Sequence, residues 1–244
     1  MQTISVFVAW GGAMPGRPAR GYGSRVRVVG FEATELRALC DELERPLKAG
    51  LLVCVPTSSG YAVVASTYSA QARSTLRQLR EVGEDVALQV LIPIGSMMGA
   101  FATVTDSARI IARAFWPGMV SVLLDSDTRE LAGTQVLLRH PQEPLLEQLT
   151  MQVGPLFASR AVLGGVEIGS REDLRSLESS RRIRVFVDAG PLSANGRSTI
   201  VDCRSDPPVV RREGTVGVAD IRSLIPSLVT NESKAAVVDT ATRE

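Results

Sequence analysis

The sequence predicts an α/β domain built on a twisted, mixed, open sheet that is flanked by helices. The run from Leu51 to Val64 is rich in valine and continuously apolar apart from one short polar turn, which is typical of strands buried on both faces. The segment from Glu32 to Ala49 repeats leucines at helical spacing, which predicts an amphipathic helix. Strands and helices alternate irregularly, with adjacent strands in the C-terminal third. This order favours a mixed sheet over a purely parallel one.

Composition places the chain among ordinary globular proteins. Its 244 residues are enough to bury a sizeable core, and 45% of them are hydrophobic and 22% charged. The formal net charge of +1 excludes a global basic field that would attract nucleic acid or a membrane surface. Of the 27 basic residues, Lys48 and Lys234 alone are lysines, which leaves few candidates for lysine-dependent chemistry.

The cysteines and the apolar runs indicate a cellular compartment. Cys40, Cys54 and Cys203 lie far apart in the sequence, so neither a zinc-binding pair nor a disulfide framework is expected. No apolar run reaches the roughly 18 residues of a membrane span, and the first residues lack the basic start and apolar block of a signal peptide. We therefore expect a protein of the reducing cytoplasm without a membrane partner.

The chain divides into three expected regions. Residues 1–30 contain a strand from Ile4 to Trp10 and a loop at 11–23 that is rich in Gly, Pro and Arg. Residues 31–228 form the main domain, and residues 229–244 form a disordered polar tail. Two interpretations of the loop stay open, because such a segment is either solvated or draped over a ligand.

Within the main domain, periodicity and turn residues predict the remaining elements. Helices are expected at 32–49, 70–82, 105–114, 144–153, 171–177 and 218–224. Strands are expected at 26–29, 51–56, 61–64, 88–94, 119–124, 135–138, 156–158, 184–188, 198–203 and 209–212. On the helix at 70–82, the pattern places Leu76 and Leu79 inward and Arg73, Arg77 and Arg80 outward.

The polar turn inside the apolar run is the first candidate site. Pro56 cannot donate a ladder hydrogen bond, so we expect it to end the first strand. The hydroxyls of Thr57, Ser58 and Ser59 then lie at an edge of the sheet, where open α/β sheets bind small ligands. The alternative is an ordinary serine-rich turn.

Searches for well-known catalytic patterns find none. The sequence contains no GxxxxGK[ST], no GxGxxG after a strand, no HExxH and no GxSxG. The single histidine, His140, follows a strand and is interpreted as a structural loop residue. The spacing of Asp125, Asp127, Asp188 and Asp202 specifies no metal site.

Several segments together resemble one family, and they follow its order from about Leu36 to Leu224. VPTSSGYAVV is similar to a PT[DE]TVYGL turn, ARIIARAFWPGMVSVLL to a helix followed by WPGPLT, and VLLRHP to VAVRxP. GPLFASRAVLGG lies where the family has an SSAN segment, VDAGPLSANGRSTIVD resembles DGG…STVVD, and VVRREGTV resembles LRPGA. From these segments the chain is identified as a member of the YrdC-like family, the threonylcarbamoyl-AMP synthases.

The resemblance implies a YrdC-like α+β fold with a concave central pocket. In the family the pocket binds ATP, L-threonine and bicarbonate and makes threonylcarbamoyl-adenylate for the t6A modification of tRNA. The resemblance therefore implies a nucleotidyltransferase with ATP as a substrate, with or without Mg²⁺, and without a tightly bound cofactor. Double-stranded RNA or tRNA is a further implied partner.

The matching motifs also imply binding roles, while the catalytic residues stay unknown. Four residues would bind substrate threonine or wall its site: Thr57, Tyr61, Arg139 and Ser198. Arg139 would hold the threonine carboxylate, a task that suits a guanidinium. Three residues would lie on the nucleotide side: Ser159, Arg160 and Arg212.

The chain departs from the family pattern in its cations. The family has a Lys-x-Arg pair after the second helix, where this sequence has Arg80 as the nearest cation and the acids Glu84 and Asp85. The SAN pattern is also replaced, and Arg160 is expected to restore some charge from another side of the pocket. The Ser193-Ala194-Asn195 triplet lies in another turn and is interpreted as a decoy.

These departures leave three functional alternatives. The chain is a divergent threonylcarbamoyl-AMP synthase, a catalytically degenerate protein that binds a nucleotide or double-stranded RNA, or a specialised-metabolism enzyme that makes another carbamoyl- or acyl-adenylate in the same pocket.

Overall fold

The computed structural model describes residues 26–32, 35–81, 86–126, 128, 135–163, 165–173, 183–193 and 196–230. The predicted strand at 4–10, the loop at 11–23, residues 174–177 of a predicted helix and residues 231–244 of the predicted tail lie outside this range. Glu84, Asp85, Asp127, Ala194 and Asn195 also lie outside it.

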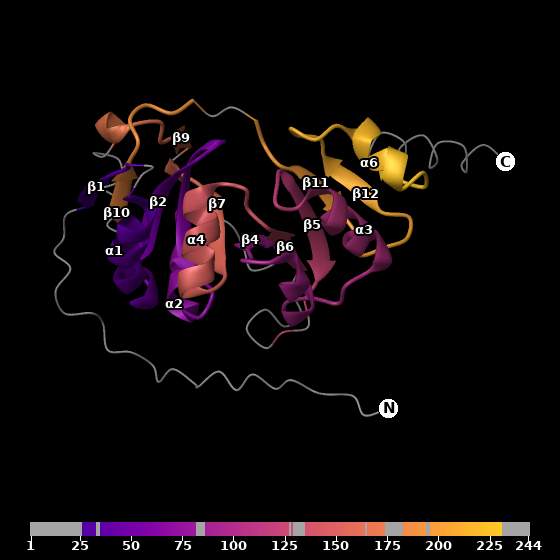
Figure 1. Ribbon diagram of the computed structural model, residues 1–244, viewed down its shortest axis with the longest axis horizontal. Helices are drawn as coiled ribbons and strands as arrows, with labels where there is room; N and C mark the ends of the chain where they lie inside the picture. Colours follow the sequence, from indigo (N-terminus) through magenta and orange to yellow (C-terminus); the bar gives the residue numbers. More distant parts are fainter. Residues whose placement is uncertain are drawn as a thin grey trace.

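The described residues contain one large sheet that runs along the length of the molecule (Figure 1). In chain order its strands are β1 (Arg27–Gly30), β2 (Leu52–Thr57), β3 (Gly60–Ser66), β4 (Leu88–Leu91), β5 (Val120–Asp125), β6 (Gln135–Arg139), β7 (Leu156–Arg160), β10 (Ile183–Asp188), β11 (Thr199–Asp202), β12 (Val209–Arg212) and β13 (Val229–Thr230). A separate hairpin is formed by β8 (Val162–Leu163) and β9 (Val166–Glu167).

The predicted mixed sheet is confirmed by the strand order, which is β1-β10-β2-β3-β7-β4-β6-β5-β11-β12-β13. Neighbouring strands are parallel in the pairs β1/β10, β10/β2, β4/β6, β5/β11 and β12/β13, and antiparallel in the other five. The order brings β7 between β3 and β4, so segments far apart in the sequence meet in the middle of the sheet.

Helices cover both faces of the sheet. They are α1 (Leu36–Lys48), α2 (Ala70–Arg80), α3 (Asp106–Phe115), α4 (Pro144–Val153) and α6 (Val218–Leu224), with short 3-10 turns η2 (Gly95–Ala100) and η3 (Arg171–Asp173). Leu43 of α1 and Leu149 of α4 belong to one core cluster, whereas Leu76 of α2 and Ile111 of α3 belong to a second. Figure 1 shows α1 and α4 side by side, while α3 and α6 lie near β5, β11 and β12.

The run from Leu51 to Val64 forms the hairpin β2–β3, and alternate residues of β2 enter the two cores, as predicted. The expectation that Pro56 ends the first strand was wrong. The strand continues to Thr57, and Pro56 lies opposite Tyr61. The pairing of β2 with β10 stops at Cys54, so position 56 has no neighbour on that side that needs a donor.

Three smaller predictions also needed correction. Arg77 is buried rather than outward, and its Nη1 donates a hydrogen bond of 2.9 Å to the carbonyl of Val86. Strand β7 continues to Arg160, two residues beyond its predicted end. Val229 and Thr230 pair with β12, so the sheet extends two residues into the predicted tail.

At the N-terminal end of the described residues, β1 pairs with β10, so residues 27–30 belong to the same sheet as the main domain.

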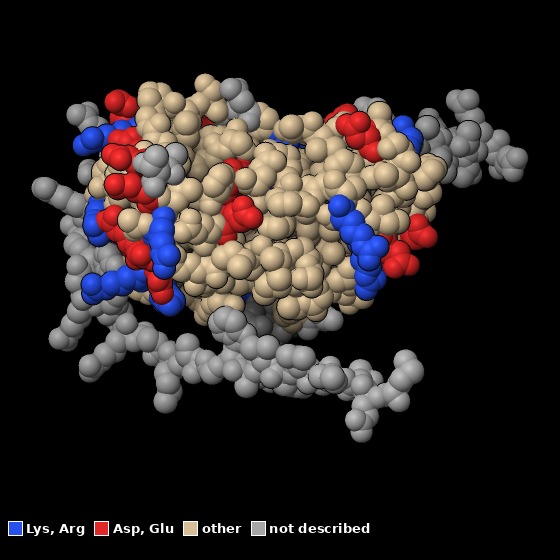
Figure 2. Space-filling view, viewed as in Figure 1, with Lys and Arg blue, Asp and Glu red and all other residues tan. Residues whose placement is uncertain are grey.

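Charged side chains are unevenly distributed over the face in Figure 2. They gather mainly over the two ends of the molecule, and the region between them is mostly uncharged. This face therefore presents no continuous basic surface. Within the described residues, no helix combines the length and the apolar character that crossing a membrane requires.

Candidate ligand-binding pocket

A cavity of about 610 Å³ opens near the middle of the sheet, between the β2–β3 hairpin with β7 on one side and β11 with β12 on the other. The strand order explains its position, because β4 and β6 lie between these two groups and form its floor with Gln89, Leu91 and Leu137. Seven residues that the sequence predicted as binding residues line this one cavity: Thr57, Tyr61, Ser159, Arg160, Arg139, Ser198 and Arg212.

The turn threonine is held by its own hairpin. The Thr57 hydroxyl donates to the carbonyl of Gly60 at 2.6 Å and accepts from the backbone N–H of Ser59 at 3.1 Å. Gly60 has a φ of 95°, which favours glycine, and it closes the turn opposite Thr57. The turn therefore presents a half-buried, fixed oxygen atom at the pocket wall.

Tyr61 is a structural wall of the pocket. Its hydroxyl donates to the carbonyl of Gly190 at 2.8 Å and accepts from the N–H of Ala189 at 3.0 Å, and its ring packs against Phe186 at 4.8 Å between centroids. Burial raises the pKa of the Tyr61 hydroxyl. The phenol thus ties the segment after β10 to the hairpin and stays neutral.

Arg139 at the end of β6 is a buried cation with an incomplete set of partners. Its Nη2 donates to the Glu143 carboxylate at 3.2 Å, and its Nη1 contacts the Met119 sulfur at 3.2 Å. Its Nε has no hydrogen-bond partner among the described residues. Burial lowers the pKa of Arg139, and Glu143 opposes this shift. Because Arg139 lines the cavity, its guanidinium is the cation that a carboxylate at this end of the pocket would meet.

Ser198 and Arg212 form the opposite wall. The Arg212 guanidinium donates from Nε and Nη2 to the Ser198 carbonyl at 3.2 and 2.9 Å, and Nη2 also lies 3.3 Å from the Ser198 hydroxyl. Ser121 donates to the same hydroxyl at 3.1 Å and accepts from Gln89 at 2.9 Å. This network fixes the Arg212 side chain before any ligand arrives.

Three arginines approach one another at the pocket: Arg160 at the end of β7, and Arg197 and Arg212 on the opposite wall. Burial lowers the pKa of Arg212, and the nearby charges of Arg197 and Arg160 lower it further. Arg160 pairs with Glu167 of the β8–β9 hairpin, and its buried Nε has no partner among the described residues. Like charges that crowd together favour a bound anion that relieves their repulsion.

Ser159 makes a local contact only, because its hydroxyl donates to the carbonyl of Arg160 at 3.1 Å. Arg80 and Glu81 also line the cavity at the end of α2. The cation nearest to the missing Lys-x-Arg pair is therefore part of the pocket, and an acid lies next to it.

Sequence reasoning missed Arg197, Glu143 and Glu167. Arg197 directly precedes Ser198 in the STIVD block, and that position was the available signal. Glu143 directly precedes α4, and an acid at the start of a helix is stabilised by the helix dipole. Its presence there therefore does not predict an arginine partner. Glu167 lies on a hairpin that the periodicity did not predict.

Two residues set aside in the sequence analysis have structural roles. His140 is partly buried, which lowers its pKa, and its carbonyl accepts from the N–H of Gly118. Asp202 receives Arg204 and Arg211 in a buried ion-pair cluster. Neither residue lines the cavity.

Sequence comparisons identify relatives of the chain. The family model named for the Sua5, YciO and YrdC proteins, described as "Telomere recombination", matches residues 45–214. A Mycobacterium leprae protein that carries a provisional threonylcarbamoyl-AMP synthase name is 33% identical over 188 residues, which cover 73% of this chain and 84% of that protein. The threonylcarbamoyl-AMP synthase of Bacillus subtilis is 26% identical over 187 residues, which cover 73% of this chain and 54% of that protein.

Solved structures share the fold. The Pyrococcus abyssi Sua5 protein complexed with L-threonine matches with a TM-score of 0.70 at 21% identity, over 84% of this chain. The match covers 62% of the longer Pyrococcus chain. YciO of Escherichia coli matches with a TM-score of 0.68 at 20% identity, over 82% of this chain and 99% of that one.

Proposed function

The chain belongs to the Sua5/YciO/YrdC family, and we propose that it makes threonylcarbamoyl-AMP from L-threonine, bicarbonate and ATP. The observation that carries the proposal is that one pocket combines a group of arginines with a polar turn. Arg160, Arg197 and Arg212 influence one another electrostatically at this pocket, and Thr57 and Arg139 line the same pocket with groups suited to an amino acid. The threonine complex of the Pyrococcus protein supports the assignment of the substrate class.

The proposed reaction balances as follows. The amine of L-threonine attacks bicarbonate, and loss of water leaves an N-carboxylate on threonine. An oxygen of that carboxylate then attacks the α-phosphorus of ATP. The bond between the α-phosphorus and the bridging oxygen breaks, and pyrophosphate leaves. The protein needs to position these groups and to stabilise the phosphate charge, and it supplies no covalent intermediate.

The arginines have distinct tasks in this proposal. Arg212, held by Ser198, is preorganised to receive a phosphate oxygen, and preorganised donors stabilise developing charge without reorganisation. Arg197 is exposed and pairs with no carboxylate among the described residues, so its full charge is available to the pyrophosphate. Arg139, which lines the pocket, would receive the threonine carboxylate through its guanidinium.

Arginine is expected to replace the missing Lys-x-Arg pair. Arg80, Arg160 and Arg197 all line the pocket, which is consistent with cations entering from other elements. The described residues contain no group of three or more His, Cys, Asp or Glu that would hold a metal ion. Phosphate charge in this pocket would meet guanidinium groups.

One observation favours the second candidate, a binding protein without the chemistry. Glu143 and Glu167 already pair with two of the five pocket arginines, and Glu81 also lines the cavity. These carboxylates reduce the charge available to a triphosphate. A pocket that binds nucleotide but turns it over poorly would have this composition.

The test is a reconstitution with the purified protein. We expect pyrophosphate and the adenylate to appear only when ATP, L-threonine and bicarbonate are all present. Arg197→Gln should raise the KM for ATP about tenfold, because a charged hydrogen bond to phosphate is lost. Arg222→Gln, an exposed position on α6 outside the pocket, is the matched control and should leave the KM unchanged.

Other outcomes identify the alternatives. Absence of pyrophosphate, together with a melting temperature that ATP raises, would support the binding protein. Turnover with another amino acid or acid in place of threonine would support the specialised-metabolism enzyme. Binding to duplex RNA that weakens steeply with salt would support an RNA partner. The proposal would be contradicted if the protein showed no turnover and if neither ATP nor threonine raised its melting temperature.

A further inference from the structure

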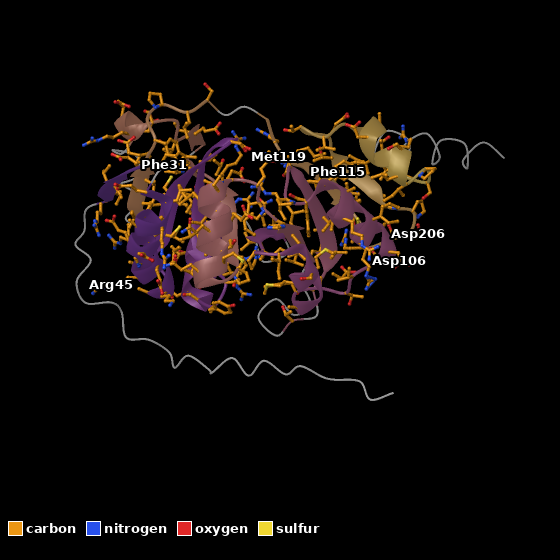
Figure 3. The ribbon with its side chains drawn as sticks, in the orientation of Figure 1. Phe31, Arg45, Asp106, Phe115, Met119 and Asp206 are labelled. Carbon is orange, nitrogen blue, oxygen red and sulfur yellow. The ribbon has the colours of Figure 1, made fainter. Side chains whose placement is uncertain are left out.

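Four side chains from separate segments meet behind the pocket wall. Ser58 comes from the β2–β3 turn, Met119 precedes β5, Arg139 ends β6 and Glu143 precedes α4. The Ser58 hydroxyl donates to one oxygen of Glu143 at 2.6 Å, and Arg139 donates to the other oxygen at 3.2 Å. The Met119 sulfur lies 3.8 Å from the Ser58 hydroxyl and 3.2 Å from Nη1 of Arg139. Figure 3 labels Met119 in the middle of the molecule.

Three of the four side chains are buried and Ser58 is exposed, so the charges of Arg139 and Glu143 depend on one another. Arg139, Met119 and Glu143 are exposed by 6%, 7% and 9% respectively. Glu143 is the one carboxylate that pairs with Arg139 among the described residues. A buried guanidinium without a carboxylate partner is strongly destabilising, so the orientation of Arg139 depends on Glu143. Glu143 does not line the cavity and acts through Arg139.

The β2–β3 turn has Ser58 next to the Glu143 carboxylate and supplies no carboxylate of its own to Arg139. The turn pattern PT[DE]TVYGL has an acid at the position that Ser58 occupies here. A serine cannot neutralise an arginine, yet its hydroxyl lies within hydrogen-bond distance of the Glu143 carboxylate. In this chain the carboxylate that pairs with Arg139 comes from the segment that enters α4.

We propose that Glu143 is the positioning residue for Arg139, and that it has taken over the counter-ion role that the turn acid would have at position 58. Ser58 fixes one carboxylate oxygen so that the other holds Nη2 of Arg139. Arg139 is thereby held where it lines the pocket. The inference rests on the proposed function where it concerns threonine, and the relocation of the carboxylate is independent of the ligand.

A reciprocal exchange tests the relocation without any ligand. Glu143→Gln removes the counter-ion, and Ser58→Asp places a second carboxylate against the first. Each single variant should lower the melting temperature, whereas S58D/E143Q restores one carboxylate and one donor and should recover most of the loss. If Glu143→Gln does not fold and the double variant does, the relocation is supported. A double variant no more stable than Glu143→Gln would overturn it.

Kinetics test the positioning role in the same proteins. Glu143→Gln should raise the KM for L-threonine about tenfold while the KM for ATP is unchanged, because one charged contact is misplaced. The double variant should return the KM for L-threonine to within about threefold of the original value. Glu147→Gln removes an exposed carboxylate from the same helix and is the control, with no change expected in either KM.

The melting-temperature cycle and the kinetics together distinguish failure of the proposed function from failure of the positioning role. A wild-type protein that neither binds nor consumes L-threonine would contradict the proposed function, and the melting-temperature cycle would still decide the relocation. A wild-type protein that uses L-threonine, combined with an unchanged threonine KM in Glu143→Gln, would overturn the positioning role alone.

Discussion

The Arg212 guanidinium donates two hydrogen bonds to the backbone carbonyl of Ser198, one from Nε at 3.2 Å and one from Nη2 at 2.9 Å. Ser198 directly precedes β11, which begins at Thr199. Arg212 is the last residue of β12, the neighbouring antiparallel strand. The carbonyl therefore orients a cation in the pocket through the backbone, and the Ser198 hydroxyl adds a longer contact to Nη2 at 3.3 Å.

Arg212→Lys should show that the shape of this cation matters as well as its charge. An ammonium group keeps the charge but cannot make the same fork of hydrogen bonds. We expect the KM for ATP to rise about tenfold, with a smaller effect on L-threonine. Arg222→Lys, at an exposed position of α6, is the control for an arginine-to-lysine substitution outside the pocket. Equal ATP kinetics in Arg212→Lys and wild type would argue against a preorganised guanidinium.

Tyr61→Phe should destabilise the fold more than the loss of one surface hydroxyl. The change leaves the carbonyl of Gly190 and the N–H of Ala189 without their shared partner. We expect the free energy of unfolding to fall by about 2 kcal/mol, which urea denaturation measures. Tyr61→Leu, which also removes the ring packing on Phe186, should cost about 1–2 kcal/mol more. A Phe variant as stable as wild type would mean that water replaces the phenol.

Asp202 should make stability depend on pH. Burial would raise the pKa of Asp202, but hydrogen bonds from Arg204 and Arg211 outweigh it and hold the pKa well below its usual range. A carboxyl whose pKa is lower in the folded protein stabilises above the unfolded value of about 3.9 and loses this contribution as the pH falls further. We therefore expect the free energy of unfolding to decline progressively as the pH falls from 5 to 3. Urea denaturation at intervals of about one pH unit measures this decline.

Asp202→Asn isolates this contribution. It removes the charged hydrogen bonds of two partly exposed arginines and leaves Arg204 with the more distant Asp125, so the free energy of unfolding at pH 7 should fall by about 2 kcal/mol. The dependence on pH should also become shallower, because the titrating group is gone. Asp106→Asn, at a largely exposed side chain, should preserve the wild-type slope. An unchanged slope in Asp202→Asn would place the acid sensitivity elsewhere.

Glu167→Gln should strengthen the binding of ATP. The Glu167 carboxylate pairs with Arg160, and both side chains are about one-third exposed. Removal of this carboxylate makes the arginine side of the pocket more positive, so the Kd for ATP should fall about threefold at low salt, and less at high salt. Glu172→Gln on η3 is the matched control. A higher Kd would mean that Glu167 positions Arg160 productively.

Much of the fold was predictable because buried strands have a local signature. The apolar run from Leu51 to Val64 predicted the β2–β3 hairpin, and the break at Trp116 and Pro117 predicted the end of α3 before β5. The hairpin β8–β9 has strands of two residues each, and so short an element leaves no periodicity in the sequence. The burial of Arg77 also escaped prediction, since its acceptor is the carbonyl of Val86, beyond the end of its helix.

The binding residues divide in a similar way. Thr57, Arg139, Ser198 and Arg212 were predicted from motif resemblance, and the structure brings them to one cavity. Their roles toward ATP and threonine stay predictions, as does the consequence of the missing Lys-x-Arg pair. Arg197 contributes to the cavity without belonging to a motif that specifies it.

The sequence by itself determined the mixed α/β class, the family and seven of the residues that line the pocket, because periodicity and motif order are properties of neighbouring residues. The tertiary structure alone decided which charges pair. Glu143 and Arg139 are four residues apart, yet their pairing also depends on Ser58 and Met119, which other strands bring to the same place. Electrostatic interactions act through space, so the sequence predicted Arg139, Arg160 and Arg212 as pocket cations, and the fold added Arg197 and assigned the partners.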